Sequence, residues 1–217
     1  MGNDPARPDL AVAHAELLRA ALAAATPFTA QVVLDLASGT GQRTPWLAEA
    51  ALPDALLLSV DNDHASLSQS VGDYRLVADA HQLPLRSASV DLVWCVAALR
   101  LFTLPQRALS EVRRVLRTGG ALVVTVAGER WVRRRFWAPQ ASPPLPLPPA
   151  DDLGAELLRD LYTAGFQQTQ LAAYLLDPPG LDLCAASLPL ADMGTSHLCA
   201  LGEPEIAPIL LVATALA

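Results

Sequence analysis

The sequence V-V-L-D-L-A-S-G-T-G, residues 32–41, decides the fold of this chain. It begins with a β-branched and aliphatic run that ends at Asp35, and it passes into a turn of small residues, Ala37-Ser38-Gly39-Thr40-Gly41. Thr44 and Pro45 then suit the N-cap and the first position of a helix that runs to about residue 51. The stretch predicts a strand, a tight loop and a helix, in that order.

The same alternation continues along the chain. Apolar runs predict further strands at Leu56–Val60, Tyr74–Val77, Val90–Val96, Ala121–Val126, Phe166–Ala173 and Ile209–Ala213. Helices are expected between the strands, and the clearest helical patterns are Leu10–Ala25, Gln106–Leu116 and a segment that begins at Asp151 or Asp152. Strands that are apolar on both faces and alternate with helices are typical of a parallel sheet covered on both sides. The predicted fold class is therefore α/β, doubly wound, with helices on both faces.

The length favours one domain over residues 1–217. Within it we expect an N-terminal helix in residues 1–31 and a ligand-binding core in 32–126. An excursion rich in Arg and Pro follows in 127–150, and a C-terminal helix with strands in 151–217.

Composition excludes several classes of function. The formal net charge of −7 argues against a general electrostatic grip on nucleic acid or on an anionic membrane surface. All 15 basic residues are Arg, so Schiff-base chemistry and a phosphate-loop lysine are excluded. We therefore expect a small-molecule partner, with no nucleic acid and no membrane, and a homodimer is the assembly left open.

Cysteine usage points to a reducing compartment. Cys95, Cys184 and Cys199 are far apart and form no C-x-x-C pair, which favours neither a disulfide framework nor a zinc site. The first residues lack the apolar core of a secretory signal. These observations predict a cytoplasmic protein without a metal centre.

Three carboxylates occur where predicted strands end: Asp35, Asp61 and Asp79. In an open α/β sheet, ligands bind beyond the carboxyl ends of the strands, so these side chains are expected at one rim. Asp61 could accept hydrogen bonds from a ribose diol, and Asp79 could accept one from the exocyclic amine of adenine. Asp35 could attract a cationic ammonium group, whereas it would repel the anionic pyrophosphate of a dinucleotide. Small residues at Gly39-Thr40-Gly41 let the backbone approach such a ligand, and the start of the next helix is expected to offer free N–H groups. The pattern favours adenosylmethionine over a dinucleotide.

Residues 32–41 followed by S-V-D-N-D (59–63) resemble the class I S-adenosylmethionine-dependent methyltransferases. The segments A-D-A-H-Q-L-P-L (78–85), S-V-D-L-V (89–93) and E-V-R-R-V-L-R-T-G-G-A-L (111–122) continue the resemblance in the family's order. It covers roughly residues 32–126, and residues 155–166 weakly. It implies a mostly parallel seven-stranded sheet whose last strand is antiparallel.

The resemblance also implies a set of cofactor-binding residues. It places Asp35, Ala37, Gly39 and Gly41 around the methionine portion of the cofactor, and Ser38 of the same loop is also expected to bind the cofactor. The remaining positions are Asp61 and Asn62 at the ribose, Asp79 and Ala80 at the adenine, and Cys95 where cofactor and acceptor meet.

Two departures from the family's pattern leave these contacts in place. Ala37 replaces the first glycine common in this loop, as in members that resemble quinone-biosynthesis enzymes, and Thr118 stands where a proline often precedes the paired glycines. The family's N-P-P-Y-like signature for planar amino groups is absent, because Trp94-Cys95-Val96-Ala97 stands there. Amide or exocyclic-amine methylation is therefore disfavoured.

The function that this resemblance implies is methyl transfer from S-adenosylmethionine to a small-molecule acceptor by in-line displacement, which needs alignment and exclusion of water. His81 is the candidate base for a hydroxyl acceptor. Two alternatives stay open: a non-catalytic adenosyl-binding or scaffolding member of the same fold, and a nicotinamide-dependent oxidoreductase. The oxidoreductase is disfavoured by Thr44 at the third-glycine place and by the additional acids Asp35 and Asp79.

Overall fold

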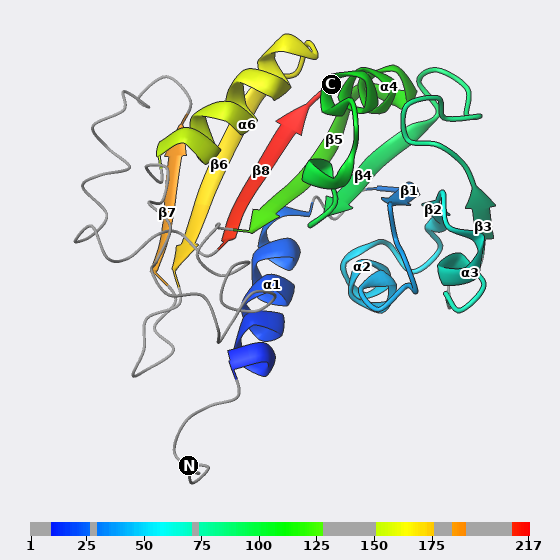
Figure 1. Ribbon diagram of the computed structural model, residues 1–217, viewed down its shortest axis with the longest axis horizontal. Coiled ribbons are helices and arrows are strands. Elements are labelled where there is room, and N and C mark those ends of the chain that lie inside the picture. Colours follow the sequence, from blue (N-terminus) through cyan, green and yellow to red (C-terminus); the bar gives the residue numbers. More distant parts are fainter. Residues whose placement is uncertain (1–9, 27–29, 71–73, 128–150, 176–183, 190–209) are drawn as a thin grey trace, which may run out of the picture.

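The structure, a computed structural model, describes residues 10–26, 30–70, 74–127, 151–175, 184–189 and 210–217 (Figure 1). Most of the predicted Arg/Pro-rich excursion, residues 128–150, lies outside the described residues, as do Cys199 and the segment around it. Among the described helices, none has the length and apolar character needed to cross a membrane.

The described strands form one sheet in the order β3-β2-β1-β4-β5-β8-β6-β7. The bounds are β1 Val32–Leu36, β2 Leu56–Asp61, β3 Tyr74–Val77, β4 Val90–Val96, β5 Leu116–Ala127, β6 Gln167–Leu175, β7 Cys184–Pro189 and β8 Leu210–Leu216. Neighbours from β3 to β5 pair in parallel. The last strand, β8, pairs antiparallel with both β5 and β6 and lies between them in Figure 1. The predicted doubly wound, mostly parallel sheet with an antiparallel last strand is confirmed.

The number of strands was predicted wrongly. The sheet contains eight strands among the described residues, whereas seven were expected. The additional strand is β7, which pairs antiparallel with the outer edge of β6. Its sequence, Cys184 to Pro189, contains small residues and a terminal proline instead of an alternating pattern, so it gave no strand signal. Edge strands tolerate such sequences because one side of their backbone needs no partner within the sheet.

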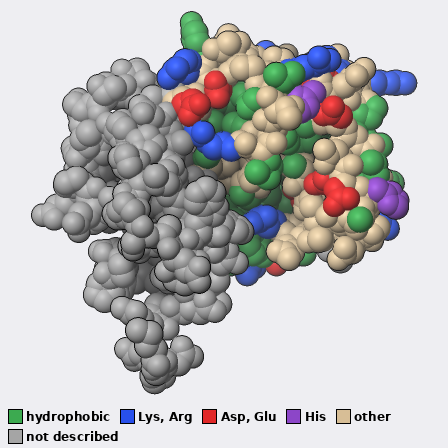
Figure 2. Space-filling view, in the orientation of Figure 1, with side chains coloured by type: hydrophobic (Ala, Val, Ile, Leu, Met, Phe, Trp, Pro, Cys, Tyr) green, Lys and Arg blue, Asp and Glu red, His purple; other side chains and the backbone are tan. Residues whose placement is uncertain are grey.

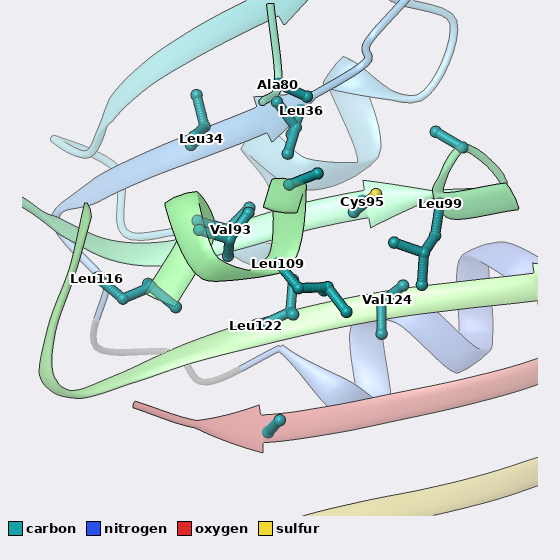
Figure 3. Close-up of a cluster of buried hydrophobic side chains, with 14 of the residues drawn as sticks. Leu34, Leu36, Ala80, Val93, Cys95, Leu99, Leu109, Leu116, Leu122 and Val124 are labelled. Carbon is teal, nitrogen blue, oxygen red and sulfur yellow. The ribbon is translucent and has the colours of Figure 1, made fainter. Parts of the chain in front are cut away.

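Helices cover both faces of the sheet. On one face α1 (Leu10–Ala25) and α2 (Thr44–Ala50) pack over a buried cluster that includes Trp94. On the other face α4 (Pro105–Val115) buries Leu109, and α6 (Asp151–Thr163) buries Leu157 and Leu161, in the cluster against the strands. Figure 3 shows this second cluster, with Leu109 of α4 above Leu122 and Val124 of β5. Alternate residues of each central strand therefore serve opposite cores, which explains their continuous apolar character.

Two predicted helical connections are short or missing. Between β2 and β3 the helix α3 has four residues, His64–Leu67. Between β3 and β4 residues 78–89 contain no helix, which corrects the expectation that helices separate all the strands. The Arg114 guanidinium of α4 fixes this connection by donating to the carbonyls of Leu83 and Leu85 at 2.9 and 2.8 Å. Glu111, paired with Arg114, accepts the Leu83 N–H at 2.9 Å. Side-chain donors thus replace the hydrogen bonds that a helix would supply.

Candidate functional site

Strands β1 and β4 lie side by side at the point where the strand order reverses, which is where open α/β sheets bind ligands. We call the rim where β1 to β5 end the carboxyl edge. Ala37 follows β1 there with φ +57°, and Ala97 follows β4 with φ +56°. A left-handed conformation costs a non-glycine residue about 1–2 kcal/mol. Two such residues at the switch point show that the backbone at the carboxyl edge adopts conformations that cost stability. Strained conformations of this kind cluster at functional sites.

Asp35 is a buried carboxylate on β1. Its side chain is 4% exposed and accepts a 2.8 Å hydrogen bond from Thr44 Oγ1 of α2. Burial raises the pKa of Asp35 to about 6, although the Thr44 hydroxyl and the Arg43 guanidinium both favour the ionised form. Because Thr44 is the first residue of α2 and Arg43 is its N-cap, the predicted capping role of Thr44 is wrong; its hydroxyl serves Asp35 instead.

The start of α2 also differs from expectation. The N–H groups of Trp46 and Leu47 donate to the Arg43 carbonyl, and that of Thr44 donates to the Gly41 carbonyl. Pro45 has no N–H. The first turn therefore offers no free donors, so ligand recognition here falls to side chains and to the loop before the helix.

Asp61 ends β2 and holds the loop that follows β1. Its Oδ2 accepts the N–H of Gly39 at 2.7 Å, and its Oδ1 accepts the N–H of Asp63 at 2.9 Å. The Asp61 carbonyl accepts the N–H of Ala78 at 3.0 Å, which brings the end of β3 alongside. The charge on Asp61 also raises the pKa of Asp35. The structure therefore brings Asp35, Asp61 and the segment with Asp79 to one edge, as predicted.

Asp79 and His81 form a close pair beyond β3. His81 Nδ1 lies 2.6 Å from Asp79 Oδ1, and the His81 backbone N–H donates to the same oxygen at 2.9 Å. These two hydrogen bonds lower the pKa of Asp79, which is therefore ionised at neutral pH. Figure 2 shows acidic side chains and histidines beside one another on the described face, with hydrophobic side chains between them. His81, predicted as a base, has its other ring nitrogen, Nε2, 3.2 Å from the backbone nitrogen of Leu104.

The loop between β1 and α2 has the features expected of a cofactor cradle. Ser38 Oγ is buried and has no hydrogen-bond partner among the described residues, so it is free to bind a polar group of a ligand. Gly39 has φ +56°, and a Cβ placed on it would meet nothing within 4 Å, so open space lies beside its backbone. Gly41 differs, because a Cβ there would lie 2.4 Å from Ser70 Oγ. Close packing against Ser70 therefore requires glycine at position 41.

The other predicted residues lie near the same edge with different exposure. Asn62 is exposed just after β2, and Ala80 is 8% exposed within the core cluster. Cys95 is 2% exposed and points into the cluster of Figure 3, and burial raises the pKa of its thiol to about 12. Cys95 is therefore a neutral packing residue in this conformation, and its contact with cofactor or acceptor stays a prediction.

A small cleft opens beside the ends of β4 and β5. Its lining residues come from the 3-10 helix η1 (Leu99–Leu101), the start of α4, the end of β5 and α6, and they are Leu99, Arg100, Pro105, Val126, Glu156, Leu157 and Asp160. Arg100 pairs with Glu156 at 2.6 Å, and Gln106 donates to Asp160 at 2.6 Å. Within the described part of the chain no three His, Cys, Asp or Glu side chains gather as metal ligands would.

Reasoning from the sequence missed two features of the site. Ala97 has no sequence signal, since a left-handed alanine cannot be recognised from its identity. Its N–H donates to Thr125 Oγ1 of β5 at 2.9 Å, so a buried threonine on the neighbouring strand stabilises the turn. The second feature is the contact between His81 and Leu104, which joins segments 23 residues apart.

Comparisons with known proteins agree with this geometry. Residues 34–124 match the family model described as a methyltransferase domain. An uncharacterised methyltransferase of Mycobacterium tuberculosis is 41% identical over 115 residues, which cover 49% of this chain and 46% of that protein. A ubiquinone/menaquinone biosynthesis C-methyltransferase of Burkholderia mallei is 33% identical over 107 residues, 46% of this chain and 44% of its own. The chain thus matches slightly less than half the length of these curated relatives.

Solved structures extend the likeness in fold over nearly the whole chain. A SAM-dependent methyltransferase of Thermotoga maritima superposes with a TM-score of 0.63 at 19% identity, covering 94% of this chain and 88% of that one. The buried, unpartnered Ser38 hydroxyl and the open space at Gly39 fit the cofactor that this family uses, S-adenosylmethionine. Over residues 34–124 the comparisons therefore support a methyltransferase domain of the class I S-adenosylmethionine-dependent kind.

Proposed function

We propose that the whole protein is an enzyme that transfers a methyl group from S-adenosylmethionine to a small-molecule acceptor by in-line displacement. The observation that carries the proposal is the gathering of Asp35, Asp61 and Asp79 at the carboxyl edge beside two left-handed alanines. The carboxylates at this edge would attract a cationic nucleoside and would repel the pyrophosphate of a dinucleotide.

Each residue has a proposed task. Asp35 would attract the ammonium group of the cofactor's amino-acid tail, with the Ser38 hydroxyl as a neighbouring polar contact. Asp61 and Asn62 would bind the ribose hydroxyls, and Asp79 with the backbone of Ala80 the adenine. The bound cofactor supplies a methyl group on a positively charged sulfur. The chain's own contribution is to hold that end of the site in line with the acceptor and to keep water out.

The acceptor is expected on the side of β4 and β5. The small cleft beside η1 lies there, and Leu101 and Leu104 are 80% and 56% exposed near it. An apolar rim with a few charged groups suits a small molecule that is partly hydrophobic. Relatives named for a C-methyltransferase and an O-methyltransferase differ in the atom they methylate, so the acceptor atom is left open.

Ligand-dependent melting tests the proposal first. A ligand that binds only the folded state raises the melting temperature according to its concentration and affinity. We expect S-adenosylhomocysteine to stabilise the protein and NADH to have no effect; the reverse pattern would favour an oxidoreductase. Mass spectrometry of candidate acceptors incubated with protein and S-adenosylmethionine then tests turnover. Binding without turnover across quinol, carboxylate and amine acceptors would instead favour the non-catalytic alternative.

A further inference from the structure

His81 connects two segments of the carboxyl edge that lie far apart in the sequence. Its Nδ1 is 2.6 Å from Asp79 Oδ1, on the loop after β3. Its Nε2 accepts the N–H of Leu104, just before α4, at 3.2 Å, and its carbonyl accepts Arg107 Nε at 3.1 Å. The Phe102 ring packs edge-on to the imidazole, with ring centroids 5.9 Å apart. His81 is thus held on all sides, and its side chain is only 17% exposed.

These contacts define the tautomer of the neutral ring. Because the Leu104 N–H can only donate, Nε2 must carry the lone pair, and the ring proton must then sit on Nδ1. That proton is donated to Asp79. Neither ring nitrogen is left to take a proton from an acceptor, so a base at this position would first have to break the Leu104 contact.

The same contacts leave Asp79 with one occupied oxygen and one available oxygen. Oδ1 receives both the ring and the backbone N–H of His81. Among the described residues, none donates a hydrogen bond to Oδ2, and the Asp79 side chain is 65% exposed. An ionised carboxylate only accepts hydrogen bonds, so Oδ2 suits an amine donor and disfavours a carbonyl.

We propose that His81 is a positioning residue for adenine recognition. It fixes the Asp79 carboxylate so that Oδ2 stays available to the exocyclic amine of adenine, and it ties this loop to the segment before α4, beside the proposed acceptor cleft. The inference rests on the proposed function, in which the adenine of the cofactor lies at Asp79.

Two substitutions separate the two contacts. His81→Asn keeps an amide N–H near the position of Nδ1, so it can still donate to Asp79, but it cannot reach Leu104. His81→Phe keeps the ring shape and loses both hydrogen bonds. His64→Phe is the matched control, because His64 is an exposed histidine of α3 and has no part in the Asp79 or Leu104 contacts.

Calorimetry with S-adenosylhomocysteine and its 6-oxo analogue, S-inosylhomocysteine, gives the readout. We expect His81→Phe to weaken S-adenosylhomocysteine binding about tenfold and to reduce the preference over the 6-oxo analogue. His81→Asn should keep most of that preference, and His64→Phe should match the wild type. Unchanged affinity and preference in His81→Phe would overturn the proposal, and so would a His81→Asn variant as impaired as His81→Phe.

The outcomes distinguish this inference from the proposed function. A wild-type protein that binds no S-adenosylhomocysteine would contradict both. A wild-type protein that binds it, with His81 variants that retain affinity and preference but lose turnover and the acidic limb of the pH–rate profile, would make His81 a base and overturn only the positioning role.

Discussion

Thr44 Oγ1 donates a 2.8 Å hydrogen bond to the buried carboxylate of Asp35, and so joins the first residue of α2 to the end of β1. The hydroxyl compensates only part of the cost of burial, because the pKa of Asp35 still rises from 3.8 to about 6. An ionised Asp35 therefore destabilises the folded protein. In the proposed function this cost would be offset by attraction of a cationic ligand, a trade of stability for activity that is common at functional sites.

Asp35→Asn should raise the free energy of unfolding at neutral pH. The folded state holds a proton on Asp35 up to about pH 6, whereas the unfolded chain releases it near 3.8. Stability from this residue is thus complete below pH 3.8 and is lost as the pH rises through 6. The loss corresponds to up to about 3 kcal/mol at one pKa unit per about 1.4 kcal/mol. Urea unfolding should show an advantage for Asp35→Asn at pH 7 that is absent at pH 4.

The same variant should bind S-adenosylmethionine more weakly, since the amide carries no charge to attract the ammonium group. Calorimetry at pH 7 measures this. Equal affinity in the variant would remove Asp35 from the cofactor site, and an equal stability advantage at pH 4 and pH 7 would show that Asp35 does not titrate in this window.

Thr44→Val should raise the pKa of Asp35 further. The hydroxyl favours the ionised carboxylate, so its removal raises the pKa of Asp35 above that of the wild type. It also leaves a buried acceptor without its donor, which costs about 1–3 kcal/mol. The stability of Thr44→Val should therefore fall more at pH 7 than at pH 4. A loss that is independent of pH would mean that the hydroxyl acts through packing alone.

Asp61→Ala should weaken S-adenosylhomocysteine binding by about 1–3 kcal/mol through loss of the ribose hydrogen bonds. The structure adds a stability cost that the sequence did not indicate, because both carboxylate oxygens hold backbone N–H groups, of Gly39 and Asp63. We expect unfolding to become easier by about 1–2 kcal/mol. Asp54→Ala, an exposed acid before the other end of β2, is the control and should leave affinity unchanged. Unchanged affinity in Asp61→Ala as well would exclude Asp61 from the site.

Elements with a strong local pattern were predicted to the residue. The structure has β3 at Tyr74–Val77, β4 at Val90–Val96 and α1 at Leu10–Ala25, as expected. Residues 78–89 were predicted wrongly because what orders them is distant: the Arg114 guanidinium reaches across from α4. Tertiary donors of this kind leave no periodicity in the segment that they hold.

The candidate site, like the fold, was predictable from the sequence only in part. That three acids meet at one edge follows from strand ends and parallel pairing, both of which the sequence indicates. The state of each acid does not follow, because it depends on partners from other elements: Thr44 at Asp35, Gly39 at Asp61 and His81 at Asp79. Backbone conformation is equally hidden, as Ala37 and Ala97 show.

Replacing left-handed alanines by glycine tests how much strain the carboxyl edge carries. Ala88→Gly is the reference, because Ala88 is exposed with φ +52° in the turn before β4, far from the proposed cofactor site. Relief of about 1–2 kcal/mol of strain is opposed by about 0.4–1 kcal/mol of added conformational entropy in the unfolded chain, so Ala88→Gly should stabilise the protein by roughly 0–1.6 kcal/mol. Ala37 has similar strain, but its methyl group packs partly against the core, and a buried methyl contributes up to about 0.8 kcal/mol. Ala37→Gly should therefore lie within about 0.5 kcal/mol of the wild type in urea unfolding and bind S-adenosylhomocysteine equally well, since glycine is common at this position of the loop. Two results would contradict the role of strain: a lower free energy of unfolding in Ala88→Gly than in the wild type, or a larger stabilisation in Ala37→Gly than in Ala88→Gly.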